Sequence, residues 1–381
     1  MKIKIIGAGL SGAVLARVLA ENNFDIEIIE KRKNIGGNVF DEKINNITIH
    51  KYGPHIFHTS KKRVAEFMER FWTLNKFKNI VEGYIGDKLV PIPFNFKSID
   101  ICFPDQKEKI KNLLLENYKN MESVTIFELF ENNDPIIKEV ANFIYKNIFE
   151  NYTIKMWDLN PKEIDSSVTS RIPVILSYKN TYFTDEYEGV PKEGYTKTIE
   201  KMLDHKNIKF SVNKNGIEYL KFENNIISFN NDKSCLIIYT GPLDELFDNR
   251  FGVLDYRSLN IKFEEINQEK FQNTAVVNFP AHPTMTRITE YKNMTFEKNE
   301  DITIISKEYP GKYSPLSKEF NEPYYPLATE KAREKYSQYK DIADCYTNLL
   351  LLGRLANYKY INMDQAIEDA LIMAKKVIKM K

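Results

Sequence analysis

The residues with the clearest chemical meaning are the glycines near the N-terminus. Gly7, Gly9 and Gly12 form a GxGxxG pattern. In a dinucleotide-binding turn the first glycine permits the tight turn, the second lets the backbone approach a pyrophosphate, and the third lets helix and strand pack closely. Glu30, eighteen residues beyond Gly12, can accept hydrogen bonds from a ribose diol. The pattern predicts a dinucleotide whose pyrophosphate lies at a helix N-terminus.

A second pair of glycines indicates which dinucleotide is bound. Gly36 and Gly37 follow Glu30 and Arg32 in an ExRxxxGG pattern. FAD-dependent Rossmann proteins use such a pattern to bring a second turn beside the phosphate and ribityl chain, and NAD enzymes seldom need this addition. We therefore expect FAD as the cofactor.

The C-terminal part of the chain offers a further cation and a further helix terminus. Gly353-Arg354 precedes a helix that the apolar spacing predicts from Asn362 to Met380. Such a terminus stabilises negative charge of the kind that a reduced flavin ring carries. Asn362 is a residue type that caps helices, so we expect its side chain to close the N-terminus. Taken alone, Gly353-Arg354 also fits an ordinary turn.

The elements that must position the glycine motif form a βαβ unit. The sequence predicts a strand at residues 2–6, a helix at 13–22 and a second strand at 26–30. This order places the GxGxxG turn between a strand end and a helix start, which is the context that the dinucleotide interpretation requires.

The rest of the chain divides into helical and β-rich stretches. Apolar residues recur at helical spacing in 61–78 and 105–150. Two prolines within 90–95 suit an extended rim better than a central strand, because proline cannot donate to a strand ladder. Short β-like runs alternate with Asn-rich turns in 208–240, and the runs in 256–310 predict an antiparallel sheet.

With 381 residues the chain is too long for one simple core, so we expect two or three subdomains that share interrupted stretches of sequence. We expect the first part of the FAD-binding domain at 1–78 and a mainly helical substrate-capping subdomain at 79–180. An antiparallel-sheet subdomain is expected at 181–330, with a strand near 236–241 returning to the nucleotide-binding sheet. The C-terminal part of the FAD-binding domain is expected at 331–381.

Composition excludes several classes of function. With 54 Lys+Arg against 53 Asp+Glu, the net charge of +1 argues against a nucleic-acid partner. Cys102, Cys235 and Cys345 lie far apart without metal-ligand spacing, so we expect no metal site, no disulfides and a cytoplasmic location. The apolar run 3–19 is broken by three glycines and Arg17, so we expect neither a signal peptide nor a membrane span.

One segment resembles a known family. The stretch from Tyr52 to Thr59, YGPHIFHT, is similar to the HIFHT motif of UDP-galactopyranose mutases. Further segments agree with that family in order and spacing: YTIKMW from Tyr152, RIP from Arg171, NTYF from Asn180, GYTK from Gly194, YTGP from Tyr239, YRSL from Tyr256, TRI from Thr286, EPYYP from Glu322 and GRLA from Gly353. The resemblance therefore runs from residue 3 to about residue 375.

The resemblance implies an α/β fold: an FAD-binding Rossmann-type domain with a helical bundle subdomain and an antiparallel β-sheet subdomain. It also implies an isomerase in which N5 of reduced FAD attacks the anomeric carbon of a nucleotide-activated hexose and displaces UDP. The ring opens through an iminium and recloses in the other size, and UDP then returns to the anomeric carbon and displaces the flavin, without net oxidation. The flavin must first be reduced by a donor such as NAD(P)H, and a homodimer is usual in the family.

The residues in these motifs suit such chemistry. Arg171 and Arg287 can place positive charge around a departing diphosphate, and with His58 they are the candidate catalytic residues. By resemblance, Tyr152 stacks on uracil and Arg171 lies on a mobile loop that excludes water when it closes. For His55 and His58 a structural role is the alternative to a contact with flavin or sugar.

The full set of candidate site residues follows from these motifs. Candidate substrate-binding residues are Asn79, Phe149, Tyr152, Thr153, Trp157, Arg171, Tyr182, Arg287, Tyr324, Tyr325 and Tyr360. Candidate cofactor-binding residues are Gly7, Gly9, Leu10, Ser11, Gly12, Glu30, Lys31, Gly37, Asn38, His55, Ile56, Gly353, Arg354, Asn362 and Met363.

Four positions depart from the family pattern. Asn362 stands where the family commonly has Asp, Met285 where it usually has Tyr, Pro54 where it has Ala, and Leu352 where it has Gly. These changes concern the sugar and diphosphate end of the site. They leave FAD as the expected cofactor and open the choice of sugar: a UDP-N-acetylhexosamine or a dTDP-6-deoxyhexose is the alternative to UDP-galactose.

Two other functions share parts of this sequence pattern. A flavin oxidoreductase of amine-oxidase type has the same N-terminal signature and predicts stoichiometric flavin reduction by its substrate. A binding module without catalysis predicts ligand binding without a furanose product. The sequence contains no GxSxG elbow, zinc motif or P-loop, so a hydrolase is not expected.

Overall fold

The computed structural model describes residues 2–158, 173–327 and 329–380. The chain forms two compact units, each assembled from separated stretches. The first unit combines Met1–Lys76, Asp185–Tyr256 and Pro323–Lys381, and the second combines Phe77–Thr184 and Arg257–Glu322. The stretch 181–330, expected as one subdomain, is therefore divided between the units.

A parallel sheet forms the centre of the first unit. Its strands follow the order β11-β2-β1-β14-β20, with β11 Ile208–Ser211, β2 Asp25–Ile29, β1 Lys2–Ile6, β14 Leu236–Tyr239 and β20 Leu349–Leu351. Each neighbouring pair is parallel. The expected return of the chain to this sheet near 236–241 is confirmed by β14, and it explains why 185–256 belongs to the first unit.

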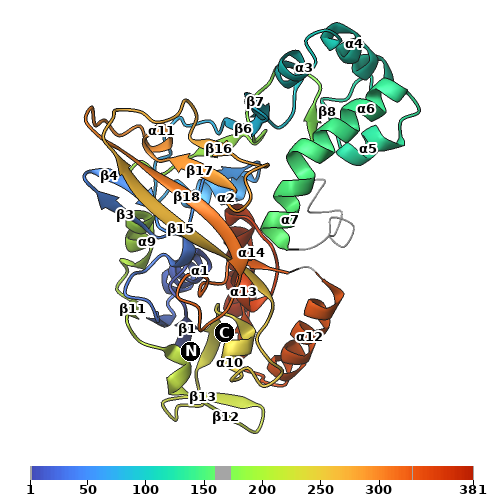
Figure 1. Cartoon of the computed structure of the whole chain (residues 1–381). Helices are drawn as coiled ribbons and strands as arrows, with labels where there is room; N and C mark the ends of the chain where they lie inside the picture. Colours follow the sequence, from blue (N-terminus) through green and yellow to red (C-terminus); the bar gives the residue numbers. More distant parts are fainter. Residues whose placement is uncertain (1, 159–172, 328, 381) are drawn as a thin grey trace. The chain divides into compact units, whose positions relative to one another are not determined.

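Two helices pack against each other in the first unit, α1 Leu10–Glu21 and α14 Met363–Ile378 (Figure 1). Helix α1 begins three residues before the predicted start at residue 13, because Gly9 is its N-cap and Gly12 lies inside its first turn. Helix α14 begins after Asn362 as predicted. The expected side-chain cap is wrong, however, since the Asn362 side chain makes no capping hydrogen bond.

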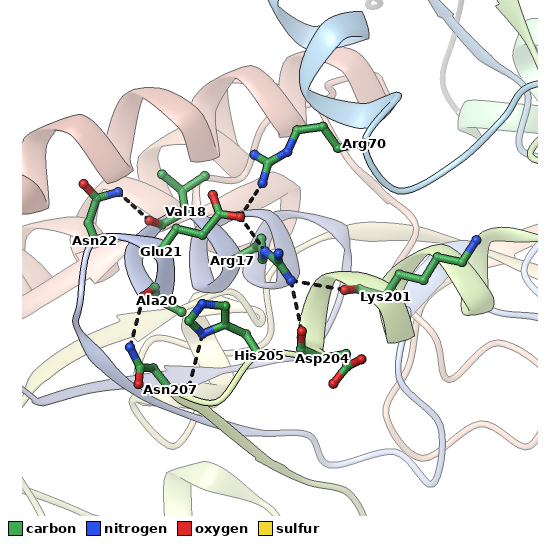
Figure 2. A network of polar contacts seen from close by, with 10 residues as sticks. All are labelled: Arg17, Val18, Ala20, Glu21, Asn22, Arg70, Lys201, Asp204, His205 and Asn207. Carbon is green, nitrogen blue, oxygen red and sulfur yellow. Dashed lines mark hydrogen bonds and ion pairs between the residues drawn. The ribbon is translucent and has the colours of Figure 1, made fainter.

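A polar network connects α1 with Arg70, which follows α2 Lys62–Met68, and with the end of α9 Tyr195–Leu203 (Figure 2). Glu21 accepts hydrogen bonds from Arg17 Nε at 2.7 Å and from Arg70. Arg17 also donates to the carbonyl of Asp204 at 3.0 Å and to that of Lys201 at 3.4 Å. These carbonyls have no partner inside α9, so Arg17 closes the end of that helix.

Helix α2 is shorter than the predicted helical stretch 61–78. It ends at Met68, a turn follows through Phe71, and residues 73–75 then pair with a distant segment. Asn75 N donates to Val190 O at 2.9 Å, and Lys192 N donates to Thr73 O at 3.0 Å. The backbone pairing with a distant segment overrides the helical spacing.

The remaining elements of the first unit are short strands, two short helices and the longer helix α12. They are β3 Asp41–Ile44, β4 Ile47–His50, β5 Phe57–Thr59, β10 Tyr187–Gly189, β12 Leu220–Glu223, β13 Ile226–Phe229, α10 Leu243–Leu246, β19 Tyr325–Pro326, α12 Glu330–Asp344 and α13 Gly353–Ala356, with 3-10 turns at Gly37–Val39 and Gly216–Tyr219.

A mostly antiparallel sheet lies in the second unit, in the order β15-β18-β17-β16-β6-β7. The strands are β15 Tyr256–Ile266, β18 Thr303–Lys312, β17 Arg287–Glu290, β16 Val276–Asn278, β6 Val81–Ile85 and β7 Lys88–Ile92. Only β16 and β6 are parallel among the pairs described. The prolines predicted to exclude a central strand lie in and after β7, the last strand in this order.

Helices make up the rest of the second unit, as predicted for 105–150. They are α3 Phe96–Cys102, α4 Lys107–Asn117, α5 Ile126–Glu131, α6 Pro135–Ile144, a π-helical turn Tyr145–Glu150 and α7 Asn151–Trp157, with α11 Lys292–Thr295 and a two-stranded pair, β8 Ser123–Val124 and β9 Val174–Ile175. The helical stretch is interrupted where Thr125 caps α5 and Asp134 caps α6, each through a side-chain oxygen.

In the described residues no helix is both long and apolar enough to cross a membrane. The same residues contain no group of side chains arranged to hold a metal ion. Cys102, Cys235 and Cys345 are free thiols.

Candidate active site

The glycine turn after β1 has the geometry of a cradle. Gly7 has φ +110°, and a Cβ on Gly12 would lie 2.3 Å from the Gly7 carbonyl oxygen. Both positions therefore exclude larger residues for reasons internal to the protein. Gly9 differs, since its φ is −76° and the nearest atom to an added Cβ is Gly37 Cα at 3.7 Å. The protein itself leaves room for a side chain at Gly9, and bare backbone at this position fits the close approach of a ligand.

The second glycine pair lies directly against the first. Gly36 pairs with Gly9 in a β-bridge, and Gly36 N donates to Ala8 O at 2.8 Å. A Cβ on Gly37 would lie 2.9 Å from Gly9 Cα. Two stretches of bare backbone thus meet at the N-terminus of α1, whose Gly9 cap supplies no side-chain acceptor. Amide groups at such a terminus are available to an anion.

Glu30 is fixed beside this turn. Its side chain is buried, and its two carboxylate oxygens accept from Ala8 N and from Arg32 N, each at 2.8 Å. A carboxylate oxygen can accept more than one hydrogen bond, so both oxygens keep capacity for a ribose hydroxyl. The residues present fit a dinucleotide.

Arg32 and Tyr52 lie beside the glycine turns, although the sequence analysis did not predict them as site residues. Both terminal nitrogens of Arg32 lie 3.2 Å from Asn38 Oδ1, and its guanidinium stands over the Tyr52 ring at 4.5 Å. The Arg of the ExRxxxGG pattern was the available signal. Lys31 lies differently: it is exposed and pairs with Glu245 at 2.8 Å.

Arg354 gathers three of the predicted tyrosines. It donates to Tyr324 O at 3.2 Å and to Ile361 O at 2.6 Å. Its guanidinium lies 5.5 Å from the Tyr325 ring and 5.4 Å from the Tyr360 ring, within range of a cation–π interaction. The structure thus brings Arg354 together with three residues predicted to bind substrate.

Gly353, the residue before Arg354, lies close to α1. Gly353 has φ +89°, and a Cβ there would lie 3.3 Å from Ser11 Oγ. Ser11 Oγ in turn donates to Ala366 O in α14 at 3.4 Å. Of the neighbouring candidates, Leu10 is buried, while Asn362 is exposed at the start of α14. Met363, the first residue of α14, is half-buried.

The two predicted histidines, His55 and His58, have different environments. They precede and follow Ile56 in the sequence. Burial, with the nearby His50 as a further cause, lowers the pKa of His55 to about 3, so its ring is neutral. His55 Nδ1 donates to the Gly53 carbonyl at 2.7 Å. His58 lies in β5, and its Nδ1 is 2.7 Å from Asp185 Oδ2.

The second unit holds the predicted diphosphate residue. Arg287, at the start of β17, donates from Nη2 to the hydroxyl oxygen of Tyr152 at 2.8 Å. Its Nε lies 3.3 Å from Glu308 Oε2. Burial raises the pKa of Glu308 although Arg287 acts in the opposite direction. Arg287 is therefore held between a phenol and a buried carboxylate.

The remaining candidates of the second unit lie on two segments. Thr153 and Trp157 are buried on α7, and Phe149 is buried in the π-helical turn before it. Tyr182 N donates to Asn79 O at 2.7 Å, which brings together two candidates that are distant in sequence. Arg171 lies outside the described residues.

Asn278 and Glu308 were not predicted as site residues. In the sheet of the second unit Asn278 stands opposite Arg287, and Arg287 stands opposite Glu308, so the three residues share one face. Within the described part of the chain, Asn278 Oδ1 and Glu308 Oε1 are buried and accept no hydrogen bond. The strand register reveals these acceptors, and no local sequence pattern does.

The parallel sheet, the paired glycine turns and Glu30 define the first unit as a Rossmann-type dinucleotide-binding domain. Known proteins agree with this class. Residues 5–71 match the family model of the NAD(P)-binding Rossmann-like domain, and residues 147–360 match the model of UDP-galactopyranose mutase.

Individual relatives cover nearly the whole chain. A UDP-galactopyranose mutase from Mycoplasma genitalium is 36% identical, over 99% of this chain and 94% of the relative. A dTDP-fucopyranose mutase from Escherichia coli is 32% identical, over 99% of this chain and 98% of the relative. The chain belongs to the UDP-galactopyranose mutase family, a family of isomerases.

The fold also agrees with a solved structure of that family. A crystal structure of reduced UDP-galactopyranose mutase aligns with a TM-score of 0.71 at 15% identity, over 100% of this chain and 94% of the other. This likeness confirms the predicted fold class.

Proposed function

We propose that this protein is a flavin-dependent mutase that interconverts the pyranose and furanose forms of a nucleotide-activated hexose. UDP-galactopyranose is the first choice of substrate, with UDP-galactofuranose as product for cell-surface polysaccharide. The observation that carries the proposal is the contact of Arg287 with Tyr152 at 2.8 Å, in a chain that also holds a dinucleotide cradle. A mutase of this family needs both a phosphate-binding cation and a flavin site.

The cofactor proposed for the cradle is FAD. Gly7, Gly9 and Gly12 would face its pyrophosphate with Gly37, and Glu30 would accept from its ribose. When bound and reduced, FAD supplies a nucleophilic nitrogen that can bond to the anomeric carbon. Arg354 would place a cation near the flavin end of the cofactor.

The residues of the second unit would hold the nucleotide. A diphosphate leaving group gains negative charge as it departs, and a guanidinium stabilises that charge with directed hydrogen bonds. Arg287 is positioned for this by Glu308 at 3.3 Å and Tyr152 at 2.8 Å. The ring of Tyr152 would stack on the base, and Trp157 would line the sugar-phosphate region.

Further assignments rest on resemblance. Arg171 would provide a second cation for the diphosphate, and Tyr324, Tyr325 and Tyr360 would donate phenolic hydrogen bonds to it without adding charge. We also propose a reducing donor such as NAD(P)H, a homodimer and a cytoplasmic location.

A second candidate substrate is a dTDP-6-deoxyhexose or a UDP-N-acetylhexosamine. Asn362 and Met285 support these alternative sugars, since both residues depart from the family pattern at the sugar and diphosphate end of the site. One relative is also named as a dTDP-fucopyranose mutase. Oxidation of the substrate by an amine-oxidase type of reaction is a further alternative, but the relatives named as mutases argue against it.

The test is product analysis with three sugars. Purified protein reduced with dithionite is incubated separately with UDP-galactose, UDP-N-acetylgalactosamine and dTDP-fucose, and the products are separated by chromatography. We expect a furanose product from at least one, with UDP-galactose converted fastest, and none from the oxidised protein. Failure of all three sugars to react would remove the proposed substrate class.

A further inference from the structure

Lys155 makes an unusual set of contacts in the second unit. Its ammonium donates to three backbone carbonyls: Phe279 at 2.7 Å, His282 at 2.6 Å and Met285 at 2.9 Å. These carbonyls come from the start, the middle and the end of the connection between β16 and β17. Lys155 of α7 therefore forms hydrogen bonds along the whole β16–β17 connection, which is more than 120 residues away in the sequence.

The ammonium is held without a counter-charge. In the described part of the chain Lys155 forms no ion pair, and burial lowers its pKa to about 8. Lys155 is half-buried, and an ammonium that loses part of its hydration needs hydrogen bonds in its place, which the three carbonyls provide. An ordinary surface lysine has no such requirement.

The connection itself is ordered around the same point. His282 Nδ1 accepts from Thr284 N at 3.1 Å and from Met285 N at 2.9 Å. The chain then passes through Thr286 to Arg287, the first residue of β17. The carbonyl of Met285 is thus held by Lys155 two residues before the candidate diphosphate-binding side chain.

Helix α7 carries both Lys155 and Tyr152, the residue that Arg287 contacts. Tyr152 and Lys155 lie three residues apart on α7, on neighbouring positions of one helix face. Tyr152 accepts from Arg287 Nη2 at 2.8 Å. Two contacts therefore join α7 to this connection and strand: one through the Tyr152 hydroxyl, the other through Lys155.

We propose that Lys155 is a positioning residue that fixes Arg287 relative to Tyr152, so that phosphate and base are bound at a set distance. The inference rests on the proposed function, in which Arg287 binds the diphosphate and Tyr152 stacks on the base. Lys155 itself touches neither. It acts by holding the β16–β17 connection against α7 before the nucleotide arrives, which reduces the ordering cost of binding.

The test measures UDP affinity by calorimetry on the FAD-loaded full chain. Lys155→Met should raise the Kd of UDP by roughly 10- to 100-fold, since small displacements of a positioned group carry losses of that size. Lys155→Gln, which keeps neutral donors, should fall between this variant and the wild type. Lys146→Met is the matched control: Lys146 is exposed in the helical turn before α7, so its variant should bind like the wild type.

A double-variant comparison separates positioning from general loss of structure. Tyr152→Phe removes the hydroxyl that Arg287 contacts. If Lys155 works through this contact, the loss in Lys155→Met,Tyr152→Phe will be clearly smaller than the product of the two single losses. A loss equal to the product would overturn the proposal, as would unchanged UDP affinity in Lys155→Met.

Failure of the proposed function gives a different result. If the wild type does not bind UDP, the nucleotide assignment is wrong. If it binds UDP and the Lys155 variants bind equally well, only the positioning role is wrong. Should Lys155→Met fail to fold, Lys155→Gln carries the same comparison, and wild-type affinity in that variant would contradict the proposal.

Discussion

The side chains of Tyr152 and Arg287 meet at 2.8 Å although 135 residues separate them in the sequence. One lies on a helix and the other begins a strand, and Glu308 Oε2 lies 3.3 Å from Nε of the same guanidinium. A guanidinium that makes one hydrogen bond and one ion pair is restricted in direction. It can stabilise a phosphate without first being ordered.

Replacement of Arg287 tests this arrangement. Arg287→Ala should lower kcat/KM by roughly 10²- to 10³-fold, because one charged donor to the leaving group is lost. FAD content should stay at the wild-type level. Kinetics with the nucleotide sugar and the flavin absorbance of the purified protein provide the two measurements.

The control for this variant is Arg250→Ala, since Arg250 is exposed in the first unit and should be replaceable without effect. Wild-type activity in Arg287→Ala would remove the arginine from the proposed site. On resemblance alone, Arg171→Ala should behave like Arg287→Ala.

The glycine cradle predicts a variant that folds but does not bind FAD. Gly9→Ala introduces a Cβ with no protein atom closer than 3.7 Å, at a φ of −76° that alanine adopts readily. We expect wild-type thermal stability of the cofactor-free protein together with a large loss of bound flavin. Gly12→Ala should instead damage the fold, because its Cβ would lie 2.3 Å from Gly7 O. Full flavin content in Gly9→Ala would contradict the cradle.

The pairing of His58 with Asp185 predicts that the two residues act as one unit. His58→Gln and Asp185→Asn should each lower kcat, by roughly tenfold or more, and the double variant should be little worse than either single one. Ser60→Ala removes a hydrogen bond to the other oxygen of Asp185 and is the milder control. Independent, multiplying effects of the two changes would show that the 2.7 Å contact has no part in activity.

The network in Figure 2 predicts a dependence of stability on pH. Burial acts to raise the pKa of Glu21, but hydrogen bonds from Arg70 and Arg17 outweigh it and lower the pKa below its ordinary value of 4.5. A carboxyl group with a lowered pKa in the folded state stabilises it at pH values above 4.5, and this contribution is lost as the pH falls through the lower, folded-state value.

Denaturant unfolding at pH 7 and at pH 4 measures this effect. Glu21→Gln should be less stable than the wild type at pH 7, and the difference should shrink at pH 4. Glu66→Gln, which removes an exposed carboxylate paired with Lys62 at 3.6 Å, should change little at either pH. An equal destabilisation by Glu21→Gln at both pH values would argue against the charge as the cause.

The sequence predicts those features that depend on neighbours along the chain. The strand, turn and helix at residues 2–30 follow from local spacing, and so does α14. The helical spacing beyond Met68 misled the prediction, because pairing of Asn75 with Val190 decides the conformation there. A local pattern cannot contain information about a partner more than a hundred residues away.

The same limit applies to the candidate site. Arg287 and Tyr152 were predicted separately from motifs, whereas their contact is a property of the fold. Glu308 and Lys155 were missed because their roles depend on strand register and on a connection folded back onto α7. Their residue types alone suggest ordinary surface charges.

The central claim is that this chain changes the ring size of its substrate without net redox change. Its most direct test is an anaerobic incubation of the dithionite-reduced protein with UDP-galactopyranose, in which the flavin absorbance and the furanose product are followed together. We predict many turnovers of product while the flavin band stays bleached. Absence of furanose from the reduced protein, together with equimolar bleaching of the flavin when the oxidised protein is incubated with the same sugar, would contradict the account.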